Sequence, residues 1–288
     1  NVLARNLASR RTNTIGVVLN DLHNPFFAEI IDGIQSVADA AEYRILIGNG
    51  KHSRSGEAEM IETFLQFRVD GIITVGATMP MSAIEAAAAS AEVVLVGRTS
   101  RSRVIDSINT DDVTGARLAV DHLVALGHRR IAHIDGGTGA GAEARRRGYS
   151  KAMTDHGLPD EITIVGGDFS EAGGYHAASE LLDPACRPTA IFAANDLSAA
   201  GALDRVEDAG LLVPNDISIV GYDNTALAAM QHLSLSTVNQ PRDELGRLAV
   251  EFLLERLRGE RTDSVHHVIA PNLVMRKTST TRAQGAST

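Results

Sequence analysis

The sequence lacks residues and segments that several classes of protein require. Its 288 residues contain a single cysteine, Cys186, which excludes a framework of disulfide bonds and a zinc site built from cysteines. No apolar run approaches the roughly 20 residues that span a bilayer. No basic stretch followed by an apolar one forms a signal segment. The chain is 44% hydrophobic, which is enough apolar material for a globular core.

Signatures of common enzyme classes are also missing. The sequence has no G-x-x-x-x-G-K-[ST], no H-E-x-x-H, no G-x-S-x-G and no EF-hand loop. His266 and His267 are adjacent in a strand-like run, where neighbouring side chains face opposite ways, so they are poorly placed to share a metal. We therefore expect no catalytic activity, no metal and no cofactor.

Charge is distributed unevenly along the chain. The formal net charge is −9, which argues against most of the chain binding nucleic acid or an anionic membrane. The first thirteen residues carry Arg5, Arg10 and Arg11 and no acid. Such a basic lead is typical of an arm that contacts an anionic partner, although a frayed terminus explains it equally well. Because the chain begins with Asn1 rather than Met, we expect a further region ahead of it.

Short β-branched runs alternate with amphipathic stretches from residue 14 onward. The predicted strands are 14–20, 44–48, 71–75, 93–96, 104–108, 130–135, 162–166, 190–194, 217–220 and 235–238. The predicted helices are 25–41, 55–67, 81–90, 112–126, 142–156, 172–182 and 197–209. Repeated βα units of this length predict parallel sheets flanked by helices, and hence an α/β fold.

The number of predicted strands indicates two lobes. About ten strands fit two open sheets better than one, with a closed barrel of eight units as the alternative. Polar stretches at 109–111 and 238–240 interrupt the alternation, and we interpret them as crossings between lobes. We predict an N-terminal lobe of residues 12–109 plus 240–270 and a C-terminal lobe of residues 110–239 plus 271–288.

Residues 137–142 (GTGAGA) match a cofactor-binding motif. They fit the G-x-G-x-x-G/A dinucleotide fingerprint between a predicted strand and a predicted helix. A glycine-rich run fits many patterns, however, and the following helix carries Arg145, Arg146 and Arg147. We favour a flexible loop that delivers an arginine to a cleft over a nicotinamide site.

Polar and aromatic residues recur after the carboxyl ends of the predicted strands, where ligands bind in open α/β sheets. Aromatic faces cover the C–H side of a sugar ring, and amide, carboxylate and guanidinium groups hydrogen-bond its hydroxyls. Each residue has a structural alternative, because Asn and Asp also cap helices and Phe also packs in cores. Their recurrence favours a sugar pocket. The residues are Asn24, Phe26, Phe27, Arg98, Arg145, Phe169, Asn195, Asp196, Asp223 and Gln240.

Several stretches of the chain together resemble one protein family. They are 14–27 (TIGVVLNDLHNPFF), 122–131 (HLVALGHRRI), 145–149 (RRRGY), 167–169 (GDF), 188–196 (PTAIFAAND), 213–223 (VPNDISIVGYD), 235–240 (LSTVNQ) and 273–277 (LVMRK). The chain resembles the ligand-sensing core of LacI/GalR-family transcriptional regulators, similar to the ribose-type periplasmic sugar-binding proteins. The resemblance implies two doubly wound parallel-sheet lobes of the periplasmic-binding-protein-like type I, with a ligand cleft between them.

The resemblance also implies roles for individual residues. It gives ligand contacts to Asn24, Phe26, Phe27, Arg98, Arg145, Phe169, Asn195, Asp223 and Gln240. Where the family often has an aspartate before the arginine that Arg98 matches, this chain has Gly97. The missing carboxylate removes one hydroxyl acceptor and puts ribose in doubt as the sugar.

Residues 3–8 (LARNLA) are similar to the hinge helix of the family, which joins a helix-turn-helix headpiece to the core. The headpiece is absent from this chain. The resemblance implies that Leu7 wedges into the operator minor groove with Arg5 beside it. It further implies a cytoplasmic homodimeric repressor whose effector controls binding to a palindromic operator.

Two other functions are compatible with parts of the sequence. A periplasmic or secreted sugar-binding protein of a transporter would use the same pocket, but only a regulator needs residues 3–8 and a dimer. An enzyme such as a dehydrogenase would use residues 137–142 and would also have no use for the hinge segment.

Overall fold

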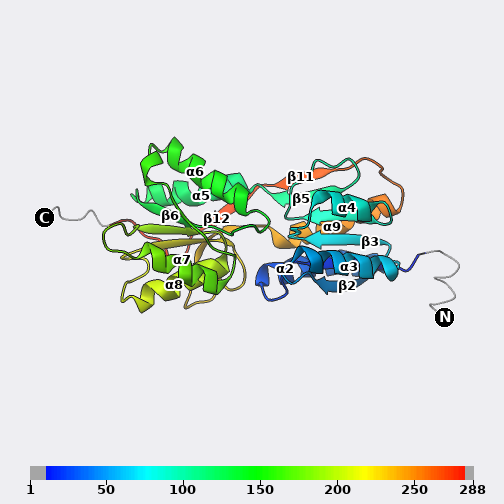
Figure 1. The fold of residues 1–288 in the computed structure, drawn as a ribbon, viewed down its shortest axis with the longest axis horizontal. Coiled ribbons are helices and arrows are strands. Elements are labelled where there is room, and N and C mark those ends of the chain that lie inside the picture. The colour runs from blue at the N-terminus through cyan, green and yellow to red at the C-terminus, as the bar shows by residue number, and fades with distance from the viewer. Residues whose placement is uncertain (1–10, 283–288) are drawn as a thin grey trace. The chain divides into compact units, whose positions relative to one another are not determined.

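The computed structural model describes residues 11–282, and the chain divides into two compact units (Figure 1). Unit 1 comprises the chain up to Asn109 together with Pro241–Ile269, and unit 2 comprises Thr110–Gln240 together with the chain from Ala270. Each unit has its own open six-stranded sheet. The predicted α/β fold is confirmed, and the alternative of a closed barrel is wrong. Arg5 and Leu7 lie outside the described residues.

Unit 1 is a three-layer sandwich with a sheet in the order β11-β5-β4-β3-β1-β2. Its elements are β1 (Thr14–Leu19), α2 (Pro25–Ala40), β2 (Arg44–Asn49), α3 (Arg54–Gln66), β3 (Gly71–Val75), α4 (Met81–Ala88), β4 (Glu92–Val96), β5 (Asp106–Thr110), α9 (Arg242–Leu257) and β11 (His266–Ile269). Strands β1 to β5 pair in parallel. Helices α2 and α9 cover one face of the sheet, and α3 and α4 cover the other (Figure 1).

Unit 2 has the same layering around a sheet in the order β12-β10-β9-β8-β6-β7. Its elements are α5 (Asp112–Ala125), β6 (Ile131–Ile134), α6 (Ala142–Asp155), a short 3-10 helix η1 (Pro159–Glu161), β7 (Thr163–Val165), α7 (Glu171–Leu181), β8 (Ala190–Ala193), α8 (Asp196–Asp208), β9 (Ser218–Asp223), β10 (Ser236–Asn239) and β12 (Asn272–Val274). Helices α5 and α6 cover one face of the sheet, and α7 and α8 cover the other.

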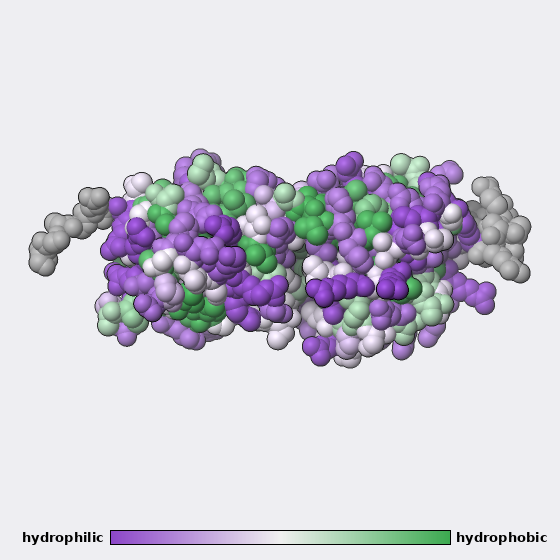
Figure 2. All heavy atoms as spheres, turned by 90° about the horizontal axis from the view of Figure 1, so that it is seen from above, coloured by the Kyte–Doolittle hydropathy of each residue, from purple (hydrophilic) through white to green (hydrophobic). Residues whose placement is uncertain are grey.

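The central strands are apolar because both faces of each sheet are covered. All five residues of β3 are buried. In β1, Val17 and Leu19 pack on the side of α2 and α9, whereas Val18 packs on the side of α3 and α4. Within residues 11–282, no helix is long and apolar enough to span a membrane. Hydrophilic side chains predominate on the face drawn in Figure 2, with hydrophobic groups in separate patches.

Two parts of the fold differ from the sequence prediction. The helix α9 was not among the predicted elements, although Leu245, Ala249 and Leu253 form a buried stripe along it. It packs closely against α2, because a Cβ on Gly246 would lie 2.1 Å from the Ile30 carbonyl oxygen. The strand β12 pairs antiparallel with β10, whereas the βα repeats predict parallel pairing. The chain between β10 and β12 belongs to unit 1, so no helix of unit 2 connects these two strands.

Candidate ligand-binding site

Five of the predicted ligand residues lie together at the carboxyl ends of the unit 2 strands. Gln240 Nε2 donates to Asp223 Oδ1 at 2.6 Å, and the Arg145 guanidinium lies 3.7 Å from the same oxygen. Asn195 Nδ2 donates to the carbonyl oxygen of Phe169 at 2.9 Å. The Arg145 guanidinium carbon is 5.5 Å from the centre of the Phe169 ring. The parallel pairing of β6 to β10 brings these residues from separate segments of the chain to one edge of the sheet.

Arg145 is the central cation of this group, and the fold fixes its orientation. It is only 5% exposed and donates from Nε to Asp112 Oδ1 at 2.9 Å. Its Nη1 donates to the carbonyl oxygen of Ala194 at 2.5 Å. The guanidinium lies 3.8 Å from the centre of the Tyr222 ring, a distance at which cation–π attraction operates.

The charges around Arg145 keep it protonated despite its burial. Burial alone would lower the pKa of the guanidinium, but the carboxylates of Asp112 and Asp223 outweigh this effect and raise it. Burial and the nearby Asp112 carboxylate raise the pKa of Tyr222 well above its ordinary value. The Tyr222 phenol is neutral and fully buried, so the group offers a ligand a fixed cation and carboxylate acceptors. These are suitable partners for the hydroxyls of a small polar ligand.

The glycine-rich loop of residues 136–141 supports the Phe169 ring. A Cβ added to Gly136 would lie 2.1 Å from Phe169 Cζ, and one added to Gly139 would lie 2.6 Å from its Cε2. Gly137 and Gly141 have φ of 63° and 83°, which favour glycine. Close packing and backbone conformation thus account for the glycines that resemble a dinucleotide fingerprint.

A strained backbone position and side-chain hydrogen bonds position the polar residues of unit 2. Asp223, the last residue of β9, has φ of 108°, a conformation that persists only where the surroundings hold it. The adjoining turn is held by Asp196, whose Oδ2 accepts from Thr225 N at 2.7 Å and whose Oδ1 accepts from Thr237 Oγ1 at 2.6 Å. Asn195 caps α8 by accepting from Ser198 N at 2.8 Å. Asn195 thus holds both this helix and the Phe169 backbone.

In unit 1 the predicted aromatic and amide residues have different environments. Asn24 is buried and caps α2, because its Oδ1 accepts from Phe26 N at 3.0 Å. Phe27 is 8% exposed and belongs to the core between the sheet and α2. The half-buried Phe26 ring packs edge-on against Phe27 with 5.3 Å between ring centres. Phe26 is therefore the ring that a ligand can contact most readily.

Arg98 follows β4 and is anchored on one side. Its Nη1 donates to the carbonyl oxygens of Ala77, at 3.3 Å, and of Met79. Burial lowers the pKa of this guanidinium, and the Glu57 carboxylate opposes the shift. Gly97 has φ of 75°, and a Cβ there would meet only the backbone nitrogen of Gly76, at 3.8 Å. No carboxylate therefore stands beside Arg98 at this position.

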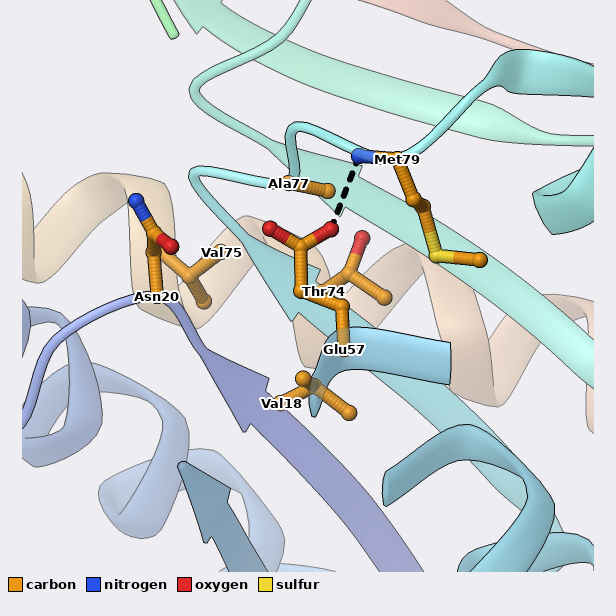
Figure 3. A pocket seen from close by; sticks show the side chains of 7 residues that line it. All are labelled: Val18, Asn20, Glu57, Thr74, Val75, Ala77 and Met79. Atoms are coloured by element: carbon orange, nitrogen blue, oxygen red, sulfur yellow. Dashed lines mark hydrogen bonds between the residues drawn. The ribbon is translucent and has the colours of Figure 1, made fainter. Parts of the chain in front are cut away.

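Beneath this edge of unit 1 lies a small pocket that contains a carboxylate (Figure 3). Glu57, which is 1% exposed, accepts hydrogen bonds from Thr78 N and Met79 N. The pocket is lined by Val18, Asn20, Glu57, Thr74, Val75, Ala77 and Met79.

Sequence reasoning missed Glu57, Asp112 and Tyr222, because each acts through contacts with residues distant in the chain. The first-turn position of Glu57 on a helix gave no separate signal.

The other titratable side chains that the structure describes do not form a metal centre. Among residues 11–282, no group of three or more His, Cys, Asp or Glu side chains could hold a metal ion. The ring of His266 instead hydrogen-bonds Ser107 Oγ at 2.9 Å and the Ser102 carbonyl oxygen at 3.0 Å. His266 thus joins β11 to β5 and to the loop before it.

Comparison with known proteins identifies relatives along nearly the whole chain. A family model for a periplasmic binding protein-like domain matches residues 120–279. Catabolite control protein A of Priestia megaterium is 34% identical over 268 residues, which cover 92% of this chain and 81% of that protein. The HTH-type transcriptional repressor PurR of Erwinia tasmaniensis is 34% identical over 283 residues, covering 96% and 82%.

Solved structures of regulators have the same fold. A LacI transcriptional regulator from a Rhodococcus species is similar with a TM-score of 0.87 and 33% identity, covering 93% of this chain and 98% of that chain. A LacI family regulator from Enterococcus faecium with bound ribose gives 0.85 and 28%, covering 93% and 99%. A lac repressor dimer bound to operator gives 0.86 and 29%, covering 97% and 98%. The chain therefore belongs to the LacI/GalR family of transcriptional regulators, as the ligand-binding core of such a protein.

Proposed function

We propose that this core of a ligand-responsive transcriptional repressor senses a monosaccharide. The observation that carries the proposal is the buried Arg145, which Asp112 and Ala194 orient beside Asp223. A guanidinium and a carboxylate at this distance can donate to one sugar hydroxyl and accept from its neighbour. The half-buried Phe169 ring supplies an apolar face for the C–H side of the sugar.

Unit 1 also contributes residues to sugar binding in this proposal. We propose that Phe26 and Arg98 are the sugar contacts of unit 1, whereas Asn24 and Phe27 serve mainly to cap α2 and fill the core. Ribose is bound in the similar Enterococcus faecium regulator, which supports a sugar. Gly97 leaves open space where the family often has an aspartate, so the preferred sugar need not be ribose.

The proposed effect of the sugar is a shift between two states of the core. A ligand changes such an equilibrium only by the difference in its affinity for the two states. A coupling free energy of about 1–3 kcal/mol between the sugar and the operator is sufficient for regulation. We propose that no catalytic step is involved and that the protein acts on DNA in the cytoplasm.

A thermal-shift panel tests this function. The chain is melted with D-ribose, D-glucose, D-galactose, cellobiose, ribose 5-phosphate and hypoxanthine. A bound ligand at 100 times its Kd stabilises the folded state by about 2.7 kcal/mol, so a monosaccharide should raise the Tm clearly. Arg145→Ala should abolish the shift, whereas Arg147→Ala on the exposed side of the same helix should not. A shift with hypoxanthine alone, or with none of the six, would contradict the proposal.

The hinge segment is a separate part of the proposed function. Residues 3–8 match the hinge helix of the family, and we propose that Leu7 wedges into the operator minor groove, with Arg5 as a second contact. In a protein that includes the headpiece, Leu7→Ala should weaken operator binding in a fluorescence anisotropy titration. It should leave the sugar affinity unchanged. Equal operator affinity in mutant and parent would remove this assignment.

A further inference from the structure

The loop of residues 77–79 in unit 1 is held by opposite charges on its two sides. Glu57 accepts from Thr78 N at 2.9 Å, from Thr78 Oγ1 at 2.7 Å and from Met79 N at 2.9 Å. Arg98 donates from Nη1 to the carbonyl oxygens of Ala77 and Met79. The peptide groups of the loop thus connect a buried carboxylate to a half-buried guanidinium.

The position of Glu57 is set by close backbone packing at the start of α3. Ser53 caps this helix by accepting from Gly56 N at 3.0 Å. A Cβ on Gly56 would lie 2.3 Å from the Gly50 carbonyl oxygen, and one on Gly50 would lie 2.8 Å from Glu57 Cγ. Glycine at both positions therefore lets the helix approach the loop after β2. The resulting burial of the carboxylate is tolerable only because the loop supplies hydrogen bonds.

Other polar side chains of the pocket give the loop no support. Asn20 Oδ1 and Thr74 Oγ1 line the same pocket, and neither atom has a hydrogen-bond partner among the described residues. Figure 3 shows the Glu57 carboxylate directed at the backbone nitrogen of Met79. The Thr78 and Met79 amides therefore depend on Glu57.

Arg98 keeps one edge of its guanidinium available. No hydrogen bond or ion pair from its Nε or Nη2 to a described residue accompanies the two bonds from Nη1. A guanidinium is planar, so fixing one nitrogen on two carbonyl oxygens also fixes the direction of the remaining donors. Arg98 follows the end of β4, so its Nε and Nη2 belong to a residue at the carboxyl ends of the parallel strands.

We propose that Glu57 is a positioning residue for Arg98 in sugar recognition. Glu57 fixes the loop of residues 77–79, and the carbonyl oxygens of Ala77 and Met79 then fix Nη1 of Arg98. The Nε and Nη2 donors of Arg98 are thereby directed at hydroxyls of the sugar. Glu57 itself does not contact the sugar. This inference rests on the proposed function, because it requires that the core senses a monosaccharide and that Arg98 binds it.

A double-mutant cycle on Glu57 and Arg98 tests the inference by isothermal titration. The probe is D-ribose, replaced by whichever monosaccharide of the thermal-shift panel binds more tightly. Glu57→Gln keeps the shape of the side chain but removes its negative charge. It also places an amide N–H donor against the backbone N–H donors of Thr78 and Met79. We expect it to weaken binding about 10-fold, the loss typical of a hydrogen bond to a charged group. Arg98→Ala should cost a similar factor, and the double mutant should bind no more weakly than Arg98→Ala.

Two further variants separate positioning from folding. Thr78→Ala removes one hydroxyl donor to Glu57 and leaves the carboxylate in place, so we expect a smaller loss of affinity and a native melting curve. If Glu57→Gln does not fold, the cycle is measured with Thr78→Ala, Arg98→Ala and the double mutant of these two. Glu59→Gln on the exposed side of the same helix is the matched control and should bind as the parent does.

The possible results distinguish this inference from the proposed function. The inference is overturned if Arg98→Ala weakens binding and Glu57→Gln does not, or if the two losses multiply in the double mutant. It is also overturned if Arg98→Ala binds normally while Arg145→Ala does not, a result that removes Arg98 from the sugar contacts but leaves the sensing of a monosaccharide through Arg145 standing. If no sugar in the panel binds the parent chain, the proposed function fails and the inference fails with it.

Discussion

Arg145 and Asp223 are the side chains whose truncation should cost the most ligand affinity. Both are nearly buried, at 5% and 3% exposed, so their hydrogen bonds to a ligand would be shielded from water. Hydrogen bonds to charged groups contribute about 1.5–3 kcal/mol each, or roughly 10- to 150-fold in affinity. Phe169→Ala should cost less and broaden ligand choice, because it removes a stacking face rather than a directional contact.

Isothermal titration of a sugar found in the thermal-shift panel measures these losses. Melting curves of the same variants provide the control, because a side chain with a purely structural role would lower the Tm without selectively weakening the ligand. Unchanged affinity in both Arg145→Ala and Asp223→Ala would place the site elsewhere in the chain.

His133 should make the folding of unit 2 sensitive to acid. It is fully buried in β6 between the rings of Tyr149 and Phe192, and its Nδ1 is 2.9 Å from the Phe192 carbonyl oxygen. Burial lowers the pKa of this imidazole from 6.5 to about 4, opposed by that hydrogen bond and the charge of Asp135. The positive charges of Arg145 and Arg146 lower it further.

The sign of the effect follows from this depressed pKa. Because the folded state disfavours the protonated ring, the stabilisation is complete above pH 6.5 and declines as the pH falls toward 4. The total loss is about 3 kcal/mol. Urea unfolding at pH 7, 5.5 and 4.5 should show most of this loss in the parent and a smaller one in His133→Leu. His23→Leu, at a side chain 92% exposed, should behave as the parent does.

Some roles of single residues could not be predicted from the sequence. Asn24 and Asn195 stand at strand ends, where the same residue type either caps a helix or binds a ligand, and both cap helices here. The sequence places Phe26 and Phe27 together, but only the fold shows that Phe27 is in the core. Asp112 lies 33 positions before Arg145 in the chain, so the pair becomes visible only when α5 packs on α6.

At the scale of elements, the glycine loop before α6 should control the position of Phe169. A methyl group at Gly136 would overlap the end of the Phe169 ring. Because this ring can swing away on its flexible side chain, Gly136→Ala should lower the Tm only slightly and weaken sugar binding several-fold. Gly166→Ala is the control, because a Cβ there would meet nothing within 4 Å. Normal sugar affinity in Gly136→Ala would show that the Phe169 ring does not contact the sugar.

Most helices and strands could be predicted because their signals are local. A strand such as β3 is five apolar or β-branched residues between turn signals, and its bounds agree with the prediction of 71–75. Helix α9, which was not predicted, has an apolar stripe that its helical periodicity could have revealed. The antiparallel β12 could not be predicted by periodicity, because only three residues pair with β10. Its direction depends on the path by which the chain returns to unit 2.

At the scale of the whole molecule, the family assignment explains why an acidic chain can belong to a DNA-binding regulator. Phosphate contacts dominate the affinity of such proteins for DNA, and in this family they belong mainly to the headpiece. The core can therefore carry a net charge of −9 without opposing its function. Arg5, Arg10 and Arg11 all lie within the first eleven residues of the chain, in and beside the segment proposed as the hinge.

The chain should form a homodimer in solution, and the edge strand β2 offers apolar side chains for the contact. β2 lies at one end of the unit 1 sheet, with Leu46 38% and Ile47 46% exposed. An exposed edge strand with apolar residues is a ready template for association with another chain. A similar lac repressor structure is described as a dimer bound to operator, which supports a second copy as the partner.

Sedimentation equilibrium at micromolar concentration measures this association. The parent should have a mass of twice 30.5 kDa, and Ile47→Lys should shift the equilibrium toward the monomer, because a buried unpaired charge at an interface costs several kcal/mol. Phe67→Lys is the matched control, since Phe67 is also apolar and is 65% exposed at the end of α3. A dimeric Ile47→Lys would place the interface on another surface. A monomeric parent would contradict the homodimer prediction itself, because a regulator requires two cores to bring two hinge segments to one palindromic operator.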